Sequence, residues 1–361
     1  MGFREDTKMN EAMKSILQLD PARGGGAMNS QQYREAVIAK LRSVIPFAAA
    51  CCTTVDPHTL LTTGAVTEQG LAAVHSVLFE YEYLHEDYMK YEHLAKAELP
   101  VACLSGVTGG SLEKSERYRK VLQPAGFGDE LRAALMAGGV CWGFLTLFRP
   151  LDSLPFQAQE CARIASVAPL IAAGLRSYAT SQPGKDSDSG AREDNGIMML
   201  NEQLVPLSAN AAANYWLEQM RQFERLDLGV LPGPVRAVCL RVVAEERASG
   251  AVPSSAKICL QTGDGTYLTV TASRLDGPEG MLAVSFVNAR SSDVFRLLAD
   301  AFTLTAREKQ LAEMLLLGLS TKELAESLHI SAYTVQDHLK SIFAKAGVSS
   351  RRELISRLLS R

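Results

Sequence analysis

Three histidines in the first third of the chain are the residues best suited by type to bind a metal ion or a haem group. His75, His85 and His93 lie on or near one segment predicted to be a long helix, and His85 and His93 are eight residues apart. That spacing puts both side chains on a similar helix face. No ligand motif such as H-E-x-x-H accompanies them. We therefore favour ordinary, partly exposed histidines, with metal or haem binding as the alternative.

Cysteines are the second group of candidates, because thiols can sense oxidants. The chain has seven, in a pattern that fits neither a disulfide framework nor zinc spacing. The redox candidates are Cys51, Cys52, Cys103 and Cys141, three of which lie in strand-like or apolar stretches. Buried thiols are usually inert packing groups, and no resolving pair is evident. Redox sensing through these cysteines therefore stays an alternative interpretation.

Catalytic motifs give no positive indication. The stretch "GVTGGS" (residues 106–111) lacks the lysine of a phosphate-binding loop. The sequence has no G-x-S-x-G, metal triad or dinucleotide fingerprint. We expect a protein that is not an enzyme and has no identifiable cofactor. An enzymatic output would require a further domain, and every segment has another assignment.

A short helix near the C-terminus has a polar side that could bind a partner. The opposite side is an apolar stripe at helical spacing, and Gly347 is well placed to end the helix. The apolar stripe comprises Val335, Leu339, Ile342, Phe343 and Ala346, and the polar side carries Asp337, Lys340 and Ser341. Such a helix is held down on one side and free to bind a partner on the other.

The charge distribution indicates what that partner is. The whole chain has a net charge of −3, but residues 305–361 contain nine Lys or Arg against six Asp or Glu. The C-terminal part is therefore +3, which leaves −6 on residues 1–304. A basic end on an acidic body favours contact with a polyanion.

Capping residues define the elements that must position this helix. Thr305 with Glu308, Ser320 with Glu323 and Ser350 with Glu353 have the spacing of capping boxes. Ser331 is a plain N-cap. Four helices are predicted, at about 306–317, 321–328, 332–346 and 350–359. A short helix, a tight turn and a longer helix are the helix-turn-helix arrangement.

The rest of the chain is predicted to be α+β. Residues 31–177 read as helix, two strands around "DPHT", a long helical segment from Leu71 to Lys96, a hairpin around Gly138-Gly139 and a closing helix. After a linker come two strands, two helices and three further strands. Helices combined with hairpins predict antiparallel sheets.

Composition sets the domain boundaries. We expect a flexible leader at 1–30, a folded domain at 31–179, a linker at 180–196, a second domain at 197–290, and a linker helix with the helical domain at 291–361. The linker "TSQPGKDSDSGAREDNG" is poor in apolar residues. The charged N-terminus lacks the apolar core of a signal peptide, and no run is long enough for a membrane helix. We expect a cytoplasmic location.

The third block resembles the DNA-binding domain of the LuxR family of bacterial transcription regulators. The likeness rests on T-x-R-E, "GLSTKELAESLHIS", TV-x-x-H, "AKAGV" and "SSRREL", and covers about 55 residues. Ala346 and Gln336 depart from the family pattern, where a larger apolar residue and a Lys or Arg are common. The resemblance implies that Gln336, Asp337 and Lys340 contact bases. It also implies that Thr334 and Lys345 lie near phosphates. Arg351 and Arg352 stand at the N-terminus of the last predicted helix, where positive charge is unfavourable unless a phosphate lies nearby, and Lys322 is a candidate phosphate contact for the same reason.

The first two blocks resemble sensory modules. Residues 31–179 look like a GAF-type domain, through "DELRAAL", "CWGFLTLFR" and "ASVAPLIAAGLR". Residues 197–290 look like a PAS domain, through "GIMMLNEQLVPLSANAAANYWL" and "GTYLTVTASRL". The implied fold class is α+β sensory domains with antiparallel sheets, followed by an all-α four-helix helix-turn-helix domain.

These resemblances imply a signal- or ligand-responsive transcription regulator. Its expected partners are double-stranded operator DNA, a second copy of the chain in a homodimer, and an unknown small-molecule effector in the GAF-like domain. Three alternatives stay open. They are a promoter reader of the sigma-factor kind, a sensory protein that controls an enzymatic or partner-binding output, and the redox-sensing regulator.

Overall fold

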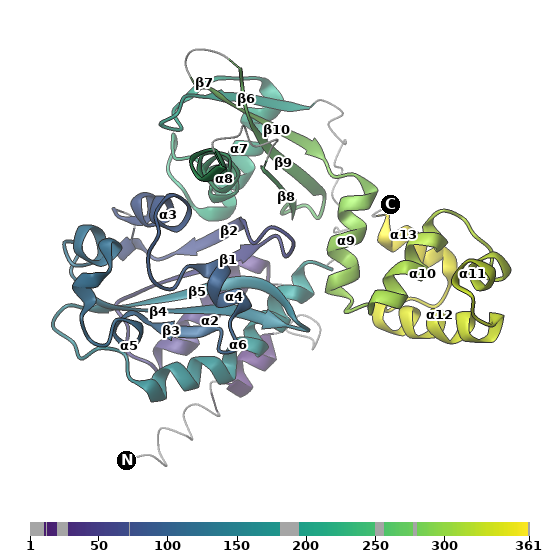
Figure 1. Ribbon diagram of the computed structural model, residues 1–361, viewed down its shortest axis with the longest axis horizontal. Helices are drawn as coiled ribbons and strands as arrows, with labels where there is room; N and C mark the ends of the chain where they lie inside the picture. Colours follow the sequence, from purple (N-terminus) through teal and green to yellow (C-terminus); the bar gives the residue numbers. More distant parts are fainter. Residues whose placement is uncertain are drawn as a thin grey trace. The chain divides into compact units, whose positions relative to one another are not determined.

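The computed structural model describes residues 11, 13–19, 28–71, 73–180, 195–249, 256–276 and 280–359. The chain forms two compact units, Met1–Tyr178 with Pro183–Asn288, and Ala179–Gln182 with Ala289–Arg361. The larger unit has two antiparallel five-stranded sheets with helices, and the smaller one is helical in its described part (Figure 1). The predicted fold class, α+β followed by all-α, is confirmed.

The first sheet has the strand order β2-β1-β5-β4-β3. Its strands are β1 Ala49–Val55, β2 Thr62–Thr67, β3 Val101–Cys103, β4 Phe127–Ala137 and β5 Val140–Pro150. The predicted hairpin is β4–β5. Gly138 and Gly139 form its two-residue turn with φ of +63° and +77°, which glycine adopts without steric cost.

Two long helices pack together against this sheet, α2 Ser30–Arg42 and α6 Ala158–Tyr178. Tyr33 of α2 donates a hydrogen bond to the carbonyl of Ile171 in α6. A Cβ at Gly174 would lie only 2.1 Å from the Tyr33 hydroxyl, so the close approach of the helices requires glycine there. In the expected leader, residues 13–19 are helical and Ile16 is buried, and most of the remainder lies outside the described residues.

The predicted long helix from Leu71 to Lys96 is wrong, because the chain breaks in its middle. It forms α3 His75–Leu84 and α4 Tyr91–Lys96, with His85 extended and Met89 at a φ of +57°. Hydrogen bonds from outside the segment hold the break. Asp87 accepts from the backbone N–H of Arg117 at 2.7 Å, and local helical periodicity cannot show such a contact. The break places Lys90 to Glu92 beside a cavity described below.

The second sheet has the order β7-β6-β10-β9-β8 and is covered by two helices. The strands are β6 Gly196–Leu200, β7 Pro206–Ala209, β8 Ala256–Gln261, β9 Tyr267–Arg274 and β10 Leu282–Asn288, and the helices are α7 Ala211–Glu224 and α8 Gly233–Ser249. The Asn210 side chain caps α7 by accepting from the Ala213 N–H. The expected linker 180–196 lies mostly outside the described residues.

Specific hydrogen bonds join the two sheets within the larger unit. Asp56, after β1, accepts from the backbone N–H of Cys259 in β8 at 2.8 Å. Glu224 of α7 accepts from the N–H groups of Ala65 in β2 (2.7 Å) and Gly233 in α8 (2.8 Å). Because removing a carboxyl group from water costs free energy unless it is hydrogen-bonded, these contacts stabilise the packing between the halves of this unit.

The smaller unit contains α9 Ser291–Ala301, α10 Ala306–Leu316, α11 Thr321–Leu328, α12 Ala332–Ala346 and α13 Arg351–Leu358. The capping boxes predicted at Thr305 and Ser320 are complete. The third is incomplete, because the Glu353 carboxylate binds the N–H of Ser349 rather than that of Ser350. Caps are local interactions, which explains why the sequence predicts these helix limits closely.

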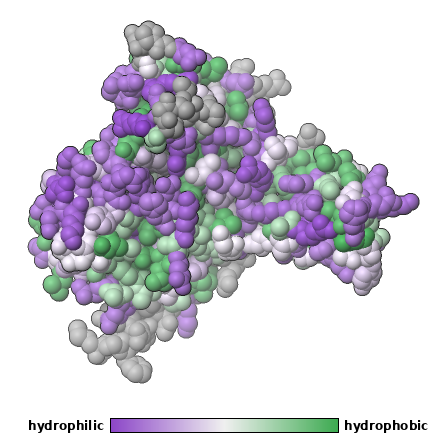
Figure 2. Space-filling model, in the orientation of Figure 1, coloured by the Kyte–Doolittle hydropathy of each residue, from purple (hydrophilic) through white to green (hydrophobic). Residues whose placement is uncertain are grey.

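Hydrophobic residues are interspersed with hydrophilic ones on the face of the molecule seen in Figure 2. Scattered apolar residues of this kind are normal on a protein surface. No helix in the described ranges is long and apolar enough to cross a membrane.

Candidate functional site

The polar face of α12 is built by a tight turn and a buried stripe. α11 ends at His329, whose φ of +51° turns the chain, and Ser331 then caps α12 by accepting from the Thr334 N–H at 3.0 Å. Four residues of the predicted stripe are buried, namely Val335, Leu339, Ile342 and Ala346, while Phe343 is half-buried. Their packing directs the opposite side chains of α12 outward.

The predicted contact residues fall into two groups by exposure. Six are exposed: Lys322, Gln336, Asp337, Lys340, Lys345 and Arg352. Thr334 and Arg351 are half-buried. Gln336, Asp337 and Lys340 lie together on the free side of α12, where the Lys340 ammonium is 3.4 Å from the Asp337 carboxylate.

Lys345 has a structural partner that the sequence does not reveal. Its ammonium lies 2.6 Å from the carboxylate of Glu308 in α10, which also accepts from the Ser341 hydroxyl at 2.6 Å. Burial alone would raise the pKa of Glu308, but Lys345, Ser341 and Thr305 lower it to about 2. Glu308 is therefore ionised and fastens α12 to α10.

Arg351 also has a partner within the protein. Its guanidinium donates to the backbone carbonyl of Leu319, which follows α10. Arg352, one residue later, is exposed. The adjacent arginines thus differ, since one joins α13 to the preceding turn and the other extends into solvent.

Tyr333 is a candidate that the sequence analysis missed. It lies in the first turn of α12 with 71% of its surface exposed. Its spacing of three and seven residues from Gln336 and Lys340 puts it on their face of the helix. An exposed aromatic at the start of a polar helix face was a usable sequence signal.

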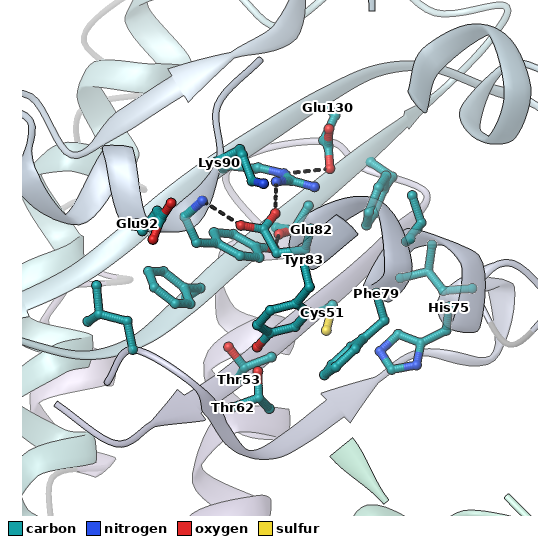
Figure 3. A pocket seen from close by; sticks show the side chains of 18 of the residues that line it. Cys51, Thr53, Thr62, His75, Phe79, Glu82, Tyr83, Lys90, Glu92 and Glu130 are labelled. Atoms are coloured by element: carbon teal, nitrogen blue, oxygen red, sulfur yellow. Dashed lines mark hydrogen bonds and ion pairs between the residues drawn. The ribbon is translucent and has the colours of Figure 1, made fainter. Parts of the chain in front are cut away.

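The larger unit contains a cavity between the first sheet and α3 (Figure 3). Its volume is about 90 Å³, measured for the centres of water-sized spheres. The lining residues are Cys51, Thr53, Leu60, Thr62, Leu71, His75, Leu78, Phe79, Glu82, Tyr83, Lys90, Tyr91, Glu92, Glu130, Arg132, Phe144, Thr146, Phe148 and Arg241. A single water needs roughly 10–15 Å³ on such a measure, so the cavity can hold a small molecule.

Arg132 is the centre of a buried ionic network at this cavity. Its guanidinium donates to Glu130 at 2.8 Å and to Glu82 at 2.6 Å, and Arg117 also binds Glu130 at 2.7 Å. Burial would raise the pKa of Glu130, but Arg117 and Arg132 lower it. Glu130 is therefore ionised, and each carboxylate of the network has an arginine partner inside the protein.

The three histidines considered as alternative metal or haem ligands lie in different surroundings. His75 lines the cavity and its pKa is lowered to about 4 by burial and by Arg236, so it is neutral at pH 7. His85 lies beyond the end of α3 and His93 lies in α4, so they do not share one helix. Within the described residues, no three His, Cys, Asp or Glu side chains are arranged to hold a metal ion.

The cysteines differ from the sequence prediction in one respect. Burial raises the pKa of the Cys51 thiol to about 11, and those of Cys52 and Cys141 to about 12, as expected for inert thiols. Cys103, however, hydrogen-bonds Cys161, which with Ser105 lowers the pKa of Cys103 to about 6. Cys161 was not among the cysteines considered from the sequence, so this pairing with Cys103 was not anticipated.

Sequence comparisons match the smaller unit. The family model described as "Bacterial regulatory proteins, luxR family" matches residues 302–358. The "Monoamine regulon transcriptional regulator" of Klebsiella aerogenes is 48% identical over 54 residues, which are 15% of this chain and 24% of that protein. The "Spore germination protein GerE" of Bacillus subtilis is 39% identical over 56 residues, 16% of this chain and 76% of that protein.

The matched residues cover a much smaller share of most of the other curated relatives than of the Bacillus protein. This chain spans about a quarter of the length of the first of them. The matched family consists of regulatory proteins rather than enzymes, which agrees with the prediction that this protein is not an enzyme.

Structural comparisons give only partial overlaps. A Vibrio cholerae VqmA dimer structure is similar at a TM-score of 0.21 and 20% identity, covering 48% of this chain and 85% of that one. The GAF domain of the cyanobacteriochrome TePixJ is similar at a TM-score of 0.31 and 14% identity, and the match covers 42% of this chain and 94% of that one. Scores this low do not establish a shared fold for the larger unit.

Proposed function

Because the chain belongs to the luxR family of bacterial regulatory proteins, we propose that it is a DNA-binding transcription regulator that responds to a small molecule. The supporting observation is that the matched region, residues 302–358, contains the whole of α10 to α13 and presents a free polar face on α12. A regulator of this kind acts on the bacterial chromosome, so the location we propose is the cytoplasm.

The exposed face of α12 supplies the proposed base contacts. In a helix-turn-helix, the second helix enters the major groove of the duplex. The Gln336 amide can pair with adenine through two hydrogen bonds, and the Asp337 carboxylate can accept from the cytosine amino group. Lys340 can donate to guanine, and Lys322 and Arg352 are proposed phosphate contacts.

Three other predicted contacts have duties within the protein. Lys345 binds Glu308, Arg351 binds the Leu319 carbonyl, and the Thr334 hydroxyl lies 2.9 Å from that of Ser331. We propose that these residues first fix the positions of α12 and α13. Each reaches a phosphate only by sharing or exchanging its present partner, so its substitution affects folding as well as DNA binding.

One α12 helix reads too few base pairs for useful specificity, which is why we propose a homodimer on DNA. Two copies related by a twofold axis would contact half-sites about 34 Å apart, one turn of the duplex. The operator would then be an inverted repeat that reflects this symmetry.

The larger unit is the proposed sensor, with a GAF-like domain at 31–179 and a PAS-like domain at 197–290 joined by the linker 180–196. The residues after 290 carry the DNA-binding domain. The effector would occupy the cavity. Phe79 of α3 lines this cavity and also belongs to the apolar core shared with α8, where the Arg236 guanidinium lies 4.7 Å from its ring. A ligand that moves Phe79 therefore changes the packing between the two sheets.

Coupling to DNA binding then follows from linkage between two states of the protein. A ligand that binds one packing of the larger unit more tightly shifts the population toward it. If that packing changes operator affinity, DNA must change ligand affinity by the same factor. This reciprocity distinguishes a regulator from a protein that carries an unrelated cavity.

Cys103 and Cys161 support a second candidate input, sensing of hydrogen peroxide. The Cys103 thiolate would attack peroxide to form a sulfenic acid and release hydroxide. The Cys161 thiol would then displace water from that sulfenic acid, giving a disulfide. The bond would join β3 to α6, which already pack together.

Selection of duplexes from a random pool by the full chain tests the proposed function. We expect enrichment of an inverted repeat whose half-site centres are about one helical turn apart. Enrichment of no sequence above non-specific binding would contradict it and would favour the enzymatic or partner-binding output. Enrichment of a promoter element without twofold symmetry would favour a promoter reader.

A further inference from the structure

The charges around the cavity balance one another. Three lining residues are cationic, Lys90, Arg132 and Arg241, and three are anionic, Glu82, Glu92 and Glu130. Arg132 is paired with both Glu82 and Glu130, and Arg241 lies 3.9 Å from Glu92. An ionised ligand would add a charge without a partner, and burying an unpaired charge is costly.

Lys90 does not alter this balance. Its ammonium donates to the backbone carbonyl of His85 at 2.9 Å and lies 3.8 Å from the carboxylate of Glu86, outside the cavity lining. The side chain is 8% exposed. An anionic ligand would therefore have to displace existing partners of Lys90 or Arg132 rather than bind a waiting cation.

The other end of the cavity is neutral and rich in hydroxyl groups. Figure 3 shows Thr53 and Thr62 near the hydroxyl end of the Tyr83 ring, away from Lys90 and Glu130. Tyr83 hydrogen-bonds Thr62, and burial raises the pKa of Tyr83 to about 12, so this phenol is neutral at pH 7.

Thr53 differs from its neighbours because its hydroxyl has no hydrogen-bond partner among the described residues. Thr53 is 6% exposed and lies in β1, on the sheet side of the cavity. A buried hydroxyl left unpaired costs roughly 1–3 kcal/mol. A ligand that reaches it would remove that cost, and Thr53 is one of the residues that line the cavity.

The size and the walls of the cavity favour a flat ring. The volume of about 90 Å³ exceeds the space for one water several times over. The rings of Phe79, Tyr83 and Phe148 form part of the lining. Aromatic walls pack well against another ring, either stacked or edge to face.

We propose that this cavity binds a small uncharged molecule with one aromatic or heteroaromatic ring and a hydrogen-bonding substituent that pairs with the Thr53 hydroxyl. This inference rests on the proposed ligand-responsive function and specifies its effector class. Specificity comes from two features. The matched ionic network rejects charged molecules, and the unpaired hydroxyl selects a polar substituent on the ring.

Three probes of nearly equal shape test the charge rule, namely benzamide (neutral), benzoate (anionic) and benzamidinium (cationic). Each is titrated at millimolar concentrations into the full chain, with the thermal midpoint and calorimetric Kd as readouts. We expect benzamide to raise the midpoint and to bind more tightly than either ion. Equal or tighter binding of benzoate or benzamidinium would overturn the proposal, as would the absence of benzamide binding.

Thr53→Val tests the hydroxyl, and Thr269→Val is its matched control. Thr269 is 4% exposed and its hydroxyl is also without a partner among the described residues, but it lies in β9, outside the cavity lining. We expect Thr53→Val to weaken benzamide binding about 3- to 10-fold. Thr269→Val should leave it unchanged.

A further variant, Thr53→Ser, keeps the hydroxyl and should retain benzamide binding. Equal benzamide affinity in the wild type and Thr53→Val would refute the role of Thr53. The ranking of the three probes on the wild-type chain holds as a test even if a variant does not fold. Operator selection without any ring compound separates the two proposals. If no operator is selected, the proposed regulator function is refuted. If an operator is selected but the three probes do not rank as expected, only the proposed effector class is refuted.

Discussion

Glu308→Gln should loosen α12 without removing any group that faces DNA. Glutamine keeps the acceptor that caps α10 but loses the charge that binds Lys345. The pKa of Glu308 falls from 4.5 to about 2, which at about 1.4 kcal/mol per unit sets an upper limit of about 3.5 kcal/mol. Because the Lys345 side chain is 30% exposed, solvent screens the pair, and we expect a loss of about 2 kcal/mol.

Amide hydrogen exchange of the full chain, read by mass spectrometry, measures this loss locally. A change of about 2 kcal/mol corresponds to roughly 30-fold faster exchange in α12 at pH 7. Glu313→Gln, an exposed change in the same helix, is the matched control and should have little effect. Exchange in α12 of Glu308→Gln that equals the control would refute the structural role of this ion pair.

The same variant has a defined pH dependence. The folded pKa of Glu308, about 2, lies below the unfolded value, so the ionised carboxylate stabilises the fold above about pH 4.5. This contribution is lost as the pH falls toward 2. The difference between wild type and Glu308→Gln should therefore be full at pH 7 and shrink below about pH 5. A difference that grows on acidification would contradict the assignment.

The other predictions concern DNA contact and oxidation. In fluorescence anisotropy titrations, Tyr333→Ala should lower affinity for a selected operator about 3- to 10-fold, whereas Tyr333→Phe should retain it. The reason is that the ring, rather than the hydroxyl, supplies apolar contact with a thymine methyl. Equal losses of affinity in both variants would refute this role. Hydrogen peroxide should produce a Cys103–Cys161 disulfide visible by peptide mass spectrometry, and Cys161→Ser should leave Cys103 as a sulfenic or higher acid. Peroxide that modifies neither residue would remove the redox input.

The third block was predictable because its signals are local. Side-chain caps at Thr305, Ser320 and Ser331 act within three residues, and they place the limits of α10, α11 and α12 to within about one residue of the structure. The β4–β5 hairpin was predictable for the same reason, since two glycines define its turn. The limits of a helix or a hairpin can be predicted from the sequence when residues close together in the chain determine them.

The cavity and the helix break were not predictable, because both depend on residues far apart in the chain. The break before α4 is held by a bond between Asp87 and Arg117. The cavity brings Thr53 of β1 together with Glu82 of α3 and Arg132 of β4. No periodicity or spacing marks such sets, so only the folded arrangement reveals them.

The ionic partner of Lys345 shows the same limit within the third block. Resemblance to the family assigned Lys345 to DNA by its position, whereas the folded structure gives it Glu308, a residue of another helix. Exposure alone cannot distinguish a side chain that awaits a phosphate from one that already holds a carboxylate. The residues with the clearest case for DNA contact are therefore those on the free face of α12.

Operator affinity of the double variant Lys340→Ala with Arg352→Ala tests the central claim most directly. The matched control is Lys40→Ala with Lys96→Ala, which removes the same charge from exposed positions of the larger unit. We predict about 10- to 100-fold weaker binding to the selected operator for the first variant and little change for the control. Unchanged affinity of Lys340→Ala with Arg352→Ala, or an equal loss in both variants, would contradict recognition of DNA through α12 and α13.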